Sequence, residues 1–299
     1  MILGFIGFGE AAYEMSLGLK SEGLNDIIAF DNMLEHPVFG MQIKKRAKCT
    51  NVKLVYTASE VITASDIVII AVPAYDTLST CETIVENLRC NQLYVDVTAA
   101  SPSIKQAAAA LVTEHGASFV DVAMMGVLSK FKHKVPILAS GEGAVQFFNI
   151  MAPYGMRIEI VGCIPGEASG IKLIRSLCMK GMAALVVEML EAAVTMGIVD
   201  KVIPGVCQTL NECTFEQTMD RLSIGTALHA ARRAEELSGC VEMLRDAGVD
   251  SIMTQAALKK HELITRLNLK ELFLGGSPEG WSQVIEAIKE QTRRKYEQV

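Results

Sequence analysis

The feature that most constrains the fold is a regular alternation of short apolar runs with helical patterns through the first half of the chain. The runs are continuous in apolar residues, as in ILGFIGF, DIVIIAVP and QLYVDVT, and helical periodicity follows each of them. Strands without polar alternation are buried on both faces, so the pattern predicts a mainly parallel sheet with helices on both sides. We expect a doubly wound α/β domain up to about residue 162.

The second half of the chain has a different pattern. After CIPGEASG no further strand-like runs occur, and from Ile171 onward the apolar residues recur at helical spacing. A chain of 299 residues is long enough for two domains. We therefore expect the α/β domain over residues 1–164 and an all-α C-terminal domain over residues 165–299, joined by a long interdomain helix.

Composition narrows the classes of partner. A net charge of −6 without any basic cluster argues against a nucleic-acid-binding surface and leaves a small molecule as the expected partner. The eight cysteines are scattered through apolar segments, none forms a CxxC pair, and no histidine pair lies near them at zinc-ligand spacing. We expect reduced cysteines in the core and no metal site.

The chain also lacks the usual targeting patterns. Its first residues, MILGFIGFGE, have no basic segment, and the most apolar helical stretch is interrupted by Lys180, Glu188 and Glu191. Neither a signal peptide nor a membrane-spanning run of about 18 uncharged apolar residues is expected. These features predict a cytoplasmic protein.

The first predicted strand ends in the motif GxGxxA, which leads directly into a helix. Gly7 permits the tight turn, Gly9 allows a pyrophosphate to approach the backbone, and Ala12 allows close packing of helix on strand. A second strand ends in Asp31, about 20 residues beyond the glycines, where an acid would bind ribose hydroxyls and repel a 2′-phosphate. The pattern favours a Rossmann-type domain that binds NAD rather than NADP; the alternative is an ordinary turn with an incidental aspartate. The residues of the turn expected to contact the cofactor are Gly7, Phe8, Gly9, Glu10 and Ala11.

A narrow polar arc lies in the otherwise small and apolar stretch GEASGIKLIRSLCMKGM, residues 166–182. At about 100° per residue, Arg175, Ser176 and Lys180 fall within about 80° of Lys172. Two ordinary explanations are that this arc faces solvent, or that the lysines extend from a buried helix to reach water.

These motifs together resemble those of the β-hydroxyacid dehydrogenase family, which includes 3-hydroxyisobutyrate and 6-phosphogluconate dehydrogenases. GFIGFGEAA is similar to its N-terminal fingerprint, AVP at 71–73 to its cofactor-contact loop, and DVTAASP at 96–102 to its substrate-loop signature. GEASGIK resembles the element that opens the interdomain helix, with Lys172 at the position of the catalytic lysine. The resemblance implies that Val72 and Pro73 contact the cofactor and that Thr98 contacts the nicotinamide end or the substrate. Thr98 could instead only cap the following helix.

The resemblance continues beyond the interdomain helix. HAARRAEE at 229–236 and GVDSIMTQA at 248–256 are similar to a subgroup labelled as phosphogluconate-dehydrogenase-like with a distinct C-terminal domain. The nearly uncharged faces of MAALVVEMLEAAVTMG suggest that the interdomain helix is buried, partly by a second subunit, as in the family. We expect a homodimer or a higher homo-oligomer.

Two departures from the family pattern concern the substrate. Better-known members carry Ser-Gly-Gly after the sixth strand, whereas this chain has Met125 at the serine position and Val127 at the last glycine. They also carry asparagine one turn beyond the lysine, where this chain has Ser176. Because a methionine cannot donate a hydrogen bond, a larger or more apolar substrate becomes more plausible than a small hydroxyacid held in the familiar way.

The expected chemistry centres on Lys172. Oxidation of a secondary alcohol needs a group that accepts the hydroxyl proton, and the reverse reaction needs the same group to donate it. A free lysine has a pKa of about 10.4, so this role requires a lower pKa, which burial and the neighbouring cations Arg175 and Lys180 could provide. Ser176 would orient Lys172 or bind the substrate oxygen.

His229, Arg232 and Arg233 follow one another at i, i+3 and i+4 and would share one face of a helix. They could form a clamp for a carboxylate or phosphate, or the arginines could simply pair with Glu235 and Glu236 on a surface helix. The candidate substrate contacts are Thr98, Met125, Gly126, Arg175, Ser176, His229 and Arg232.

The residues and the resemblance together predict an NAD-dependent oxidoreductase, with NADP less favoured, that acts on a 3-hydroxyacid or a related secondary alcohol. One alternative is reduction of an imine, against which Lys172 argues mildly because the lysine position commonly differs in that group. A second alternative is a nucleotide-binding sensor that has lost catalysis.

Overall fold

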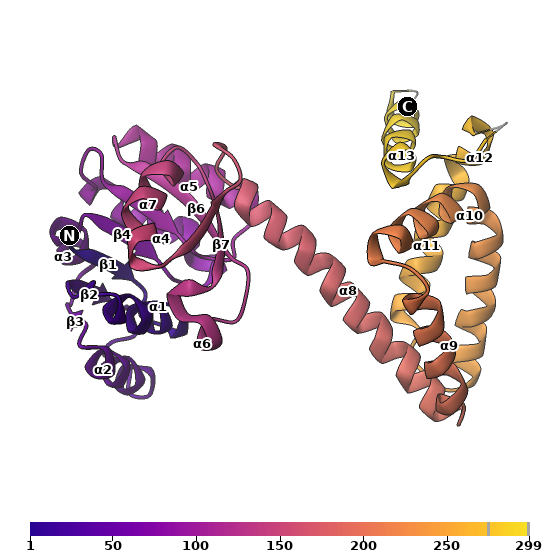
Figure 1. The fold of residues 1–299 in the computed structure, drawn as a ribbon, viewed down its shortest axis with the longest axis horizontal. Coiled ribbons are helices and arrows are strands. Elements are labelled where there is room, and N and C mark those ends of the chain that lie inside the picture. The colour runs from indigo at the N-terminus through magenta and orange to yellow at the C-terminus, as the bar shows by residue number, and fades with distance from the viewer. Residues whose placement is uncertain (274–275, 298–299) are drawn as a thin grey trace. The chain divides into compact units, whose positions relative to one another are not determined.

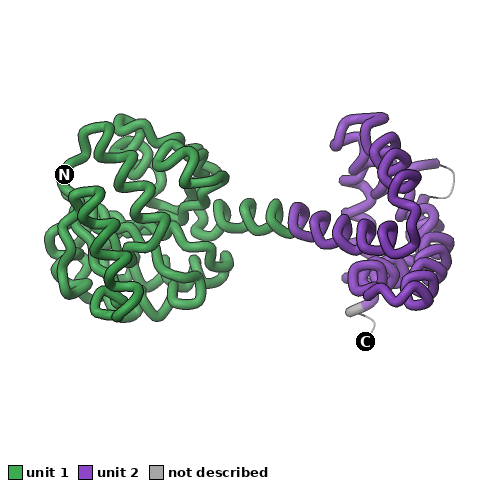
Figure 2. The backbone as a smooth tube through the Cα atoms, turned by 90° about the horizontal axis from the view of Figure 1, so that it is seen from below, with its two compact units in different colours: residues 1–177 green, residues 178–299 purple. Residues whose placement is uncertain are grey.

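The computed structural model describes residues 1–273 and 276–297. The chain divides into two compact units, residues 1–177 and residues 178–299, shown in two colours in Figure 2. The sequence-based boundary lies at residues 164/165, in the loop between the last strand and the helix Glu167–Thr195, α8. The division into units falls instead inside α8, because the first turns of this helix pack on unit 1.

Unit 1 is a doubly wound α/β domain, as the sequence predicts. Its eight strands form one sheet in the order β3-β2-β1-β4-β5-β6-β7-β8, in which only the β6–β7 pair is antiparallel. The strands, gathered in unit 1 in Figure 1, are β1 (Leu3–Ile6), β2 (Ile27–Phe30), β3 (Lys53–Leu54), β4 (Ile67–Ile70), β5 (Leu93–Asp96), β6 (Ser118–Met124), β7 (Pro136–Ser140) and β8 (Arg157–Ile160). The helices before α8 are α1 (Glu10–Ser21), α2 (Phe39–Thr50), α3 (Ala58–Ala64), α4 (Thr77–Ile84), α5 (Pro102–Glu114), α6 (Leu128–Phe131) and α7 (Ala144–Met151).

Helices cover both faces of this sheet, which explains why its strands are continuously apolar. In β4, Ile67 and Ile69 face the core formed with α1, α2 and α7, while the alternate residues face the core formed with α3, α4 and α5. On the latter face Tyr94 of β5 stacks on Phe119 of β6, with ring centroids 5.6 Å apart. Because side chains alternate along a strand, Asp96 and Asp121, each two residues further on, project from this same face.

In unit 2, all regular elements among the described residues are helical, as expected. Besides the second part of α8 they are α9 (Val199–Asn211), α10 (Phe215–Asp246), α11 (Ile252–Arg266), α12 (Leu269–Leu272) and α13 (Trp281–Tyr296). The largest core cluster joins α10 to α11, α12 and α13 through Ala227, Ala230, Ile264, Leu269 and Val284. The helix α10 is kinked at His229, where φ is −131° and ψ is 23°.

A buried carboxylate fixes α11 to α8 within unit 2. Glu188 is 8% exposed and accepts hydrogen bonds from the backbone N–H groups of Met253 (2.7 Å) and Thr254 (2.9 Å) and from the Thr254 hydroxyl (2.5 Å). Burial raises the pKa of Glu188, but these hydrogen bonds outweigh it and leave the pKa below its ordinary value. An acid that interrupts an apolar stretch therefore caps the first turn of another helix.

The expectation that the cysteines lie in the core is wrong for most of them. Only Cys81 is buried, while five others are exposed and two are intermediate, and all eight are free thiols. Cysteines in apolar segments resemble core residues in sequence, whether or not the fold buries them. None of the helices among the described residues is both long and apolar enough to span a bilayer.

Candidate functional site

The turn after β1 has a backbone that only glycine can adopt at its first position. Gly7 has φ +88°, and a Cβ atom there would stand 2.5 Å from the carbonyl oxygen of Ala71. The strand β1 lies between β2 and β4, so the direction of strand order reverses beside it. In sheets of this kind ligands bind at the carboxyl ends of the strands at such a reversal.

The second glycine of the turn faces open space. No atom lies within 4 Å of a Cβ built on Gly9, and α1 begins with the next residue, Glu10. A pyrophosphate can therefore approach this backbone and the free N–H groups of the first helical turn. Glu10 is exposed and Ala11 is half-buried. Phe8 is fully buried with its ring against Phe5, so only its backbone belongs to the turn.

Asp31 follows β2 and is held in place by two backbone groups. Its Oδ2 atom accepts a hydrogen bond from the Phe8 N–H (2.7 Å), and its Oδ1 atom accepts one from the Met33 N–H (2.8 Å). The carboxylate thus joins the glycine turn to the end of β2 and keeps lone pairs free for further donors, such as ribose hydroxyls. Gly7, Gly9 and Asp31 together fit a dinucleotide.

The loops after β4 and β5 lie at the same edge of the sheet. Val72 is half-buried and Pro73 is exposed, so both can meet a ligand beside the glycine turn. Thr98 is only 5% exposed, and its hydroxyl accepts a hydrogen bond from Thr77 Oγ1 at 2.9 Å. The Thr98 side chain therefore joins two loops in the protein interior.

A buried ionic cluster, which the sequence reasoning missed, lies behind these loops. Lys105 of α5 is fully buried, and its Nζ atom is 2.8 Å from Asp96 Oδ1, 2.9 Å from the Asp96 carbonyl oxygen and 3.3 Å from Asp121 Oδ1. The two aspartates lie directly opposite each other in the β5–β6 pair. Their position inside two apolar runs, each as Val-Asp-Val, was the one sequence signal that could have pointed to this cluster.

Asp121 also attaches the start of α8 to the sheet. Its carboxylate accepts hydrogen bonds from Gly166 N (3.1 Å), Ser169 N (2.9 Å) and Ser169 Oγ (2.6 Å). Ser140 of β7 donates to the same carboxylate at 3.2 Å and accepts from the N–H of Ala168 at 3.1 Å. The first turn of α8 is thereby fixed to β6 at the level where the neighbouring strand β5 ends.

Lys172 follows one turn after Ser169 and is half-buried in unit 1. Burial lowers its pKa from the ordinary lysine value, Lys105 lowers it further, and Asp121 acts in the opposite direction. The hypothesis that Arg175 and Lys180 lower this pKa is wrong: both are exposed, and the cation that acts on Lys172 is Lys105. Within the polar arc, Arg175 and Lys180 are thus exposed, whereas Lys172 is half-buried.

The remaining candidates of unit 1 lie near the same segments. Ser176 is half-buried on the next turn of α8. Met125 follows β6, is half-buried, and donates its backbone N–H to the Pro136 carbonyl at 2.7 Å, while Gly126 after it is exposed. Across residues 1–273 and 276–297, no three His, Cys, Asp or Glu side chains lie together as metal ligands.

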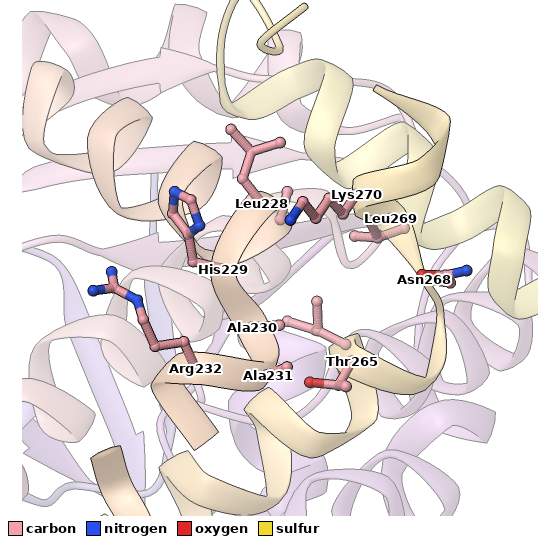
Figure 3. Close-up of a pocket in the computed structure, with 11 residues that line it drawn as sticks. Leu228, His229, Ala230, Ala231, Arg232, Thr265, Asn268, Leu269 and Lys270 are labelled. Atoms are coloured by element: carbon pink, nitrogen blue, oxygen red, sulfur yellow. The ribbon is translucent and has the colours of Figure 1, made fainter. Parts of the chain in front are cut away.

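Within unit 2, His229 and Arg232 line a pocket of about 350 Å³ between the kink of α10 and the α11–α12 segment. Lys270, Thr265 and Asn268 add further polar groups, and no acidic residue is part of the lining. Figure 3 shows Lys270 extending from α12 toward α10. The pocket therefore offers three basic side chains beside an apolar wall.

The kink separates residues that the sequence placed on one face. Arg233 points elsewhere and donates from Nη1 to the Leu222 carbonyl (3.1 Å) and to Thr226 Oγ1 (2.7 Å), on the turns before the kink. Arg232 lies 3.6 Å from Glu236, and both side chains are exposed, so this pair is weak. The expected three-residue clamp thus reduces to His229 and Arg232.

Comparisons with protein families match both parts of the chain. Residues 2–158 match the family model described as the NAD binding domain of 6-phosphogluconate dehydrogenase. Residues 193–264 match a domain of unknown function, DUF1932.

Individual relatives extend over most of the chain. An uncharacterised protein of Methanothermus fervidus is 29% identical over 253 residues, which cover 85% of this chain and 94% of the relative. A solved conserved protein of unknown function, described as structurally similar to 3-hydroxyacid dehydrogenases, is 30% identical with a TM-score of 0.60; the match covers 90% of this chain and 99% of that one. An imine reductase from Myxococcus stipitatus in complex with NADP+ has a TM-score of 0.69 at 16% identity, over 98% of this chain and 99% of its own, and shares the fold.

The two glycines of the turn predict opposite kinds of defect when each is replaced by alanine. Gly7→Ala forces a side chain to φ +88° and against the Ala71 carbonyl, so we expect clear destabilisation of unit 1 in thermal unfolding. Gly9→Ala meets no protein atom, so we expect unchanged unfolding but at least about tenfold weaker NADH binding in a fluorescence titration. Unimpaired NADH binding by a folded Gly9→Ala variant would contradict this assignment of the phosphate site.

Proposed function

The chain belongs to the family of the NAD binding domain of 6-phosphogluconate dehydrogenase, and on that premise we propose that it is a nicotinamide-dependent oxidoreductase. Its proposed reaction is hydride transfer between the cofactor and a 3-hydroxyacid or a related secondary alcohol. The observation that carries the proposal is the half-buried Lys172, attached through the first turn of α8 to the sheet edge that bears the dinucleotide turn.

The proposed cofactor is NAD. Asp31 stands where the adenosine ribose would bind, and a carboxylate there accepts hydrogen bonds from ribose hydroxyls but repels the 2′-phosphate of NADP. The NADH titration, repeated with NADPH on the unaltered protein, is expected to give weaker binding. Equal affinity for both cofactors would contradict this preference.

Lys172 is the proposed general acid/base. When bound, the nicotinamide ring would accept hydride from the alcohol carbon or return it. In oxidation the neutral Lys172 Nζ takes the hydroxyl proton, and in reduction the ammonium gives a proton to the carbonyl oxygen. The lowered pKa of Lys172 increases its neutral fraction near neutral pH, which favours its use as a base. Ser176 and Arg175 are proposed to bind the substrate from the next turn of α8.

The proposed substrate is anionic and has an apolar part. Met125 and Gly126 would contact this apolar part, because a thioether offers no hydrogen-bond donor for a carboxylate. Thr98 would contact the ligand only through its backbone, since its hydroxyl is buried against Thr77. Within unit 2, the pocket lined by His229 and Arg232 has basic side chains that suit an anionic group.

A second candidate is imine reduction, which the fold shared with imine reductases supports. A third is nucleotide sensing without catalysis, consistent with the absence of the serine and asparagine of better-known dehydrogenases. An assay that follows nicotinamide absorbance with hydroxyacids and with cyclic imines as substrates distinguishes these three functions. Turnover of hydroxyacids alone supports the dehydrogenase, turnover of imines alone the reductase, and no turnover with either the sensor.

We also propose that the protein is a homodimer. Exposed apolar residues occur along the whole of α8, in its parts in both units. The most exposed of them are Ile174 (72%), Leu177 (76%) and Val194 (67%). A helix with this many exposed apolar side chains is normally covered. Sedimentation equilibrium is expected to give twice the chain mass, and a monomer would contradict the proposal.

Removing the amine of Lys172 tests its proposed role as the general acid/base. Lys172→Ala is expected to lower kcat for alcohol oxidation by at least about 10²-fold, the usual contribution of a general base, while NADH binding stays unchanged. Lys180→Ala is the matched control, because Lys180 is an exposed lysine on the same helix. A Lys172→Ala variant that binds NADH and keeps its turnover within about tenfold would exclude this role.

The pocket of unit 2 predicts anion binding that is independent of the dinucleotide. With saturating NADH present, calorimetric titration with inorganic phosphate, and in parallel with malonate, should show binding. The combined replacement of Arg232 and Lys270 by alanine should weaken it by at least about tenfold, while Arg245→Ala, in the same helix but outside the pocket, should not. Affinity that survives the double replacement would overturn the assignment.

A further inference from the structure

The proposed function leaves unexplained why a lysine is completely buried behind the site. The side chain of Lys105 is 0% exposed, as are those of Asp96 and Asp121. A buried ammonium is costly unless its hydrogen bonds and its charge are both satisfied. Its three N–H donors face three acceptors, which are the Asp96 carboxylate, the Asp96 carbonyl and the Asp121 carboxylate. Each donor of the ammonium group therefore has an acceptor.

The charges of Lys105 and Asp121 also act on the pKa of Lys172. Without Lys105, the charge of Asp121 would act on Lys172 unopposed, and a nearby carboxylate favours the protonated form of a lysine. With Lys105 in place, one ammonium already balances one of the two carboxylates. Lys105 and Asp121 then act on the pKa of Lys172 in opposite directions, and the lowering by Lys105 is the larger of the two effects.

The same cluster also has a geometric role. Asp121 accepts hydrogen bonds from Gly166 and Ser169 in the first turn of α8 and is 3.3 Å from the Lys105 ammonium. Lys105 thus restrains the carboxylate that attaches the helix bearing Lys172. A shift of this carboxylate would move the first turn of α8 with it.

We propose that Lys105 is a positioning residue for Lys172: its buried ammonium fixes Asp121, and through Asp121 the start of α8, and it supplies a positive charge that acts on the Lys172 amine. This inference rests on the proposed function for its consequence in catalysis. Its physical content concerns Lys172 alone and requires neither cofactor nor substrate to test.

The test compares variants that separate charge from folding. Lys105→Met alone leaves two buried carboxylates without a counter-ion and can fail to fold. Combining it with Asp96→Asn removes one of these charges. Asp96→Asn alone is the matched control, because it makes the same change at Asp96 while Lys105 stays in place, and an asparagine oxygen can still accept the bonds of Oδ1.

The measurement is competitive labelling with trace acetic anhydride, which reacts only with neutral amines, followed by mass spectrometry of the peptide that contains Lys172. In the unaltered protein the labelling midpoint of Lys172 should lie below that of the exposed Lys180. In Lys105→Met/Asp96→Asn the midpoint should rise by on the order of one pH unit, while Asp96→Asn alone should leave it nearly unchanged.

Either of two results overturns the proposal: equal midpoints for Lys172 and Lys180 in the unaltered protein, or an unshifted Lys172 midpoint in the folded double variant. The first is measurable even if no variant folds. Loss of turnover in Lys172→Ala together with an unshifted midpoint would leave the proposed function standing and remove only the role of Lys105. A shifted Lys172 midpoint in a protein without any turnover would support the role of Lys105 and contradict the proposed function.

Discussion

The Asp121 carboxylate is the group on which the rest of the candidate site depends. A buried carboxylate is tolerated only when donors surround it, and here the donors come from β7, from the first turn of α8 and from Lys105 of α5. One side chain in the middle of β6 therefore determines where the long helix begins. Lys172 owes its half-buried position to this attachment, because it lies only one turn further along.

The dinucleotide turn and Lys172 are brought to one edge of the sheet by different means. The turn is local: Gly7 must be glycine because the β4 backbone lies against it, and Asp31 joins the turn to the next strand. Lys172 arrives from far along the chain, and long-range hydrogen bonds to Asp121 hold its helix. Both belong to unit 1, so the proposed proton carrier and the proposed cofactor site share one rigid framework.

The sequence predicted features that follow from local patterns. Runs of isoleucine and valine indicated the parallel sheet, GxGxxA indicated the turn, and helical spacing together with the family resemblance pointed to Lys172. The sequence did not predict that Lys105 is buried, because in SIKQAAAAL it looks like an ordinary solvent-facing lysine. Its burial depends on two aspartates that only the register of β5 and β6 brings together. Likewise, the i, i+3, i+4 rule failed at His229 because the helix is kinked there.

The central claim is that Lys172 carries the proton of the alcohol. Its most direct test is the pH dependence of hydride transfer in the unaltered protein, with deuterium at the transferred position, on the alcohol carbon for oxidation and on the reduced nicotinamide for reduction, so that chemistry limits the rate. The logarithm of the rate constant for alcohol oxidation should rise with unit slope as pH increases and level off at a pH below the ordinary lysine pKa. The rate constant for reduction of the matching ketone should fall over the same pH range. Rates that do not depend on pH in either direction would contradict the account.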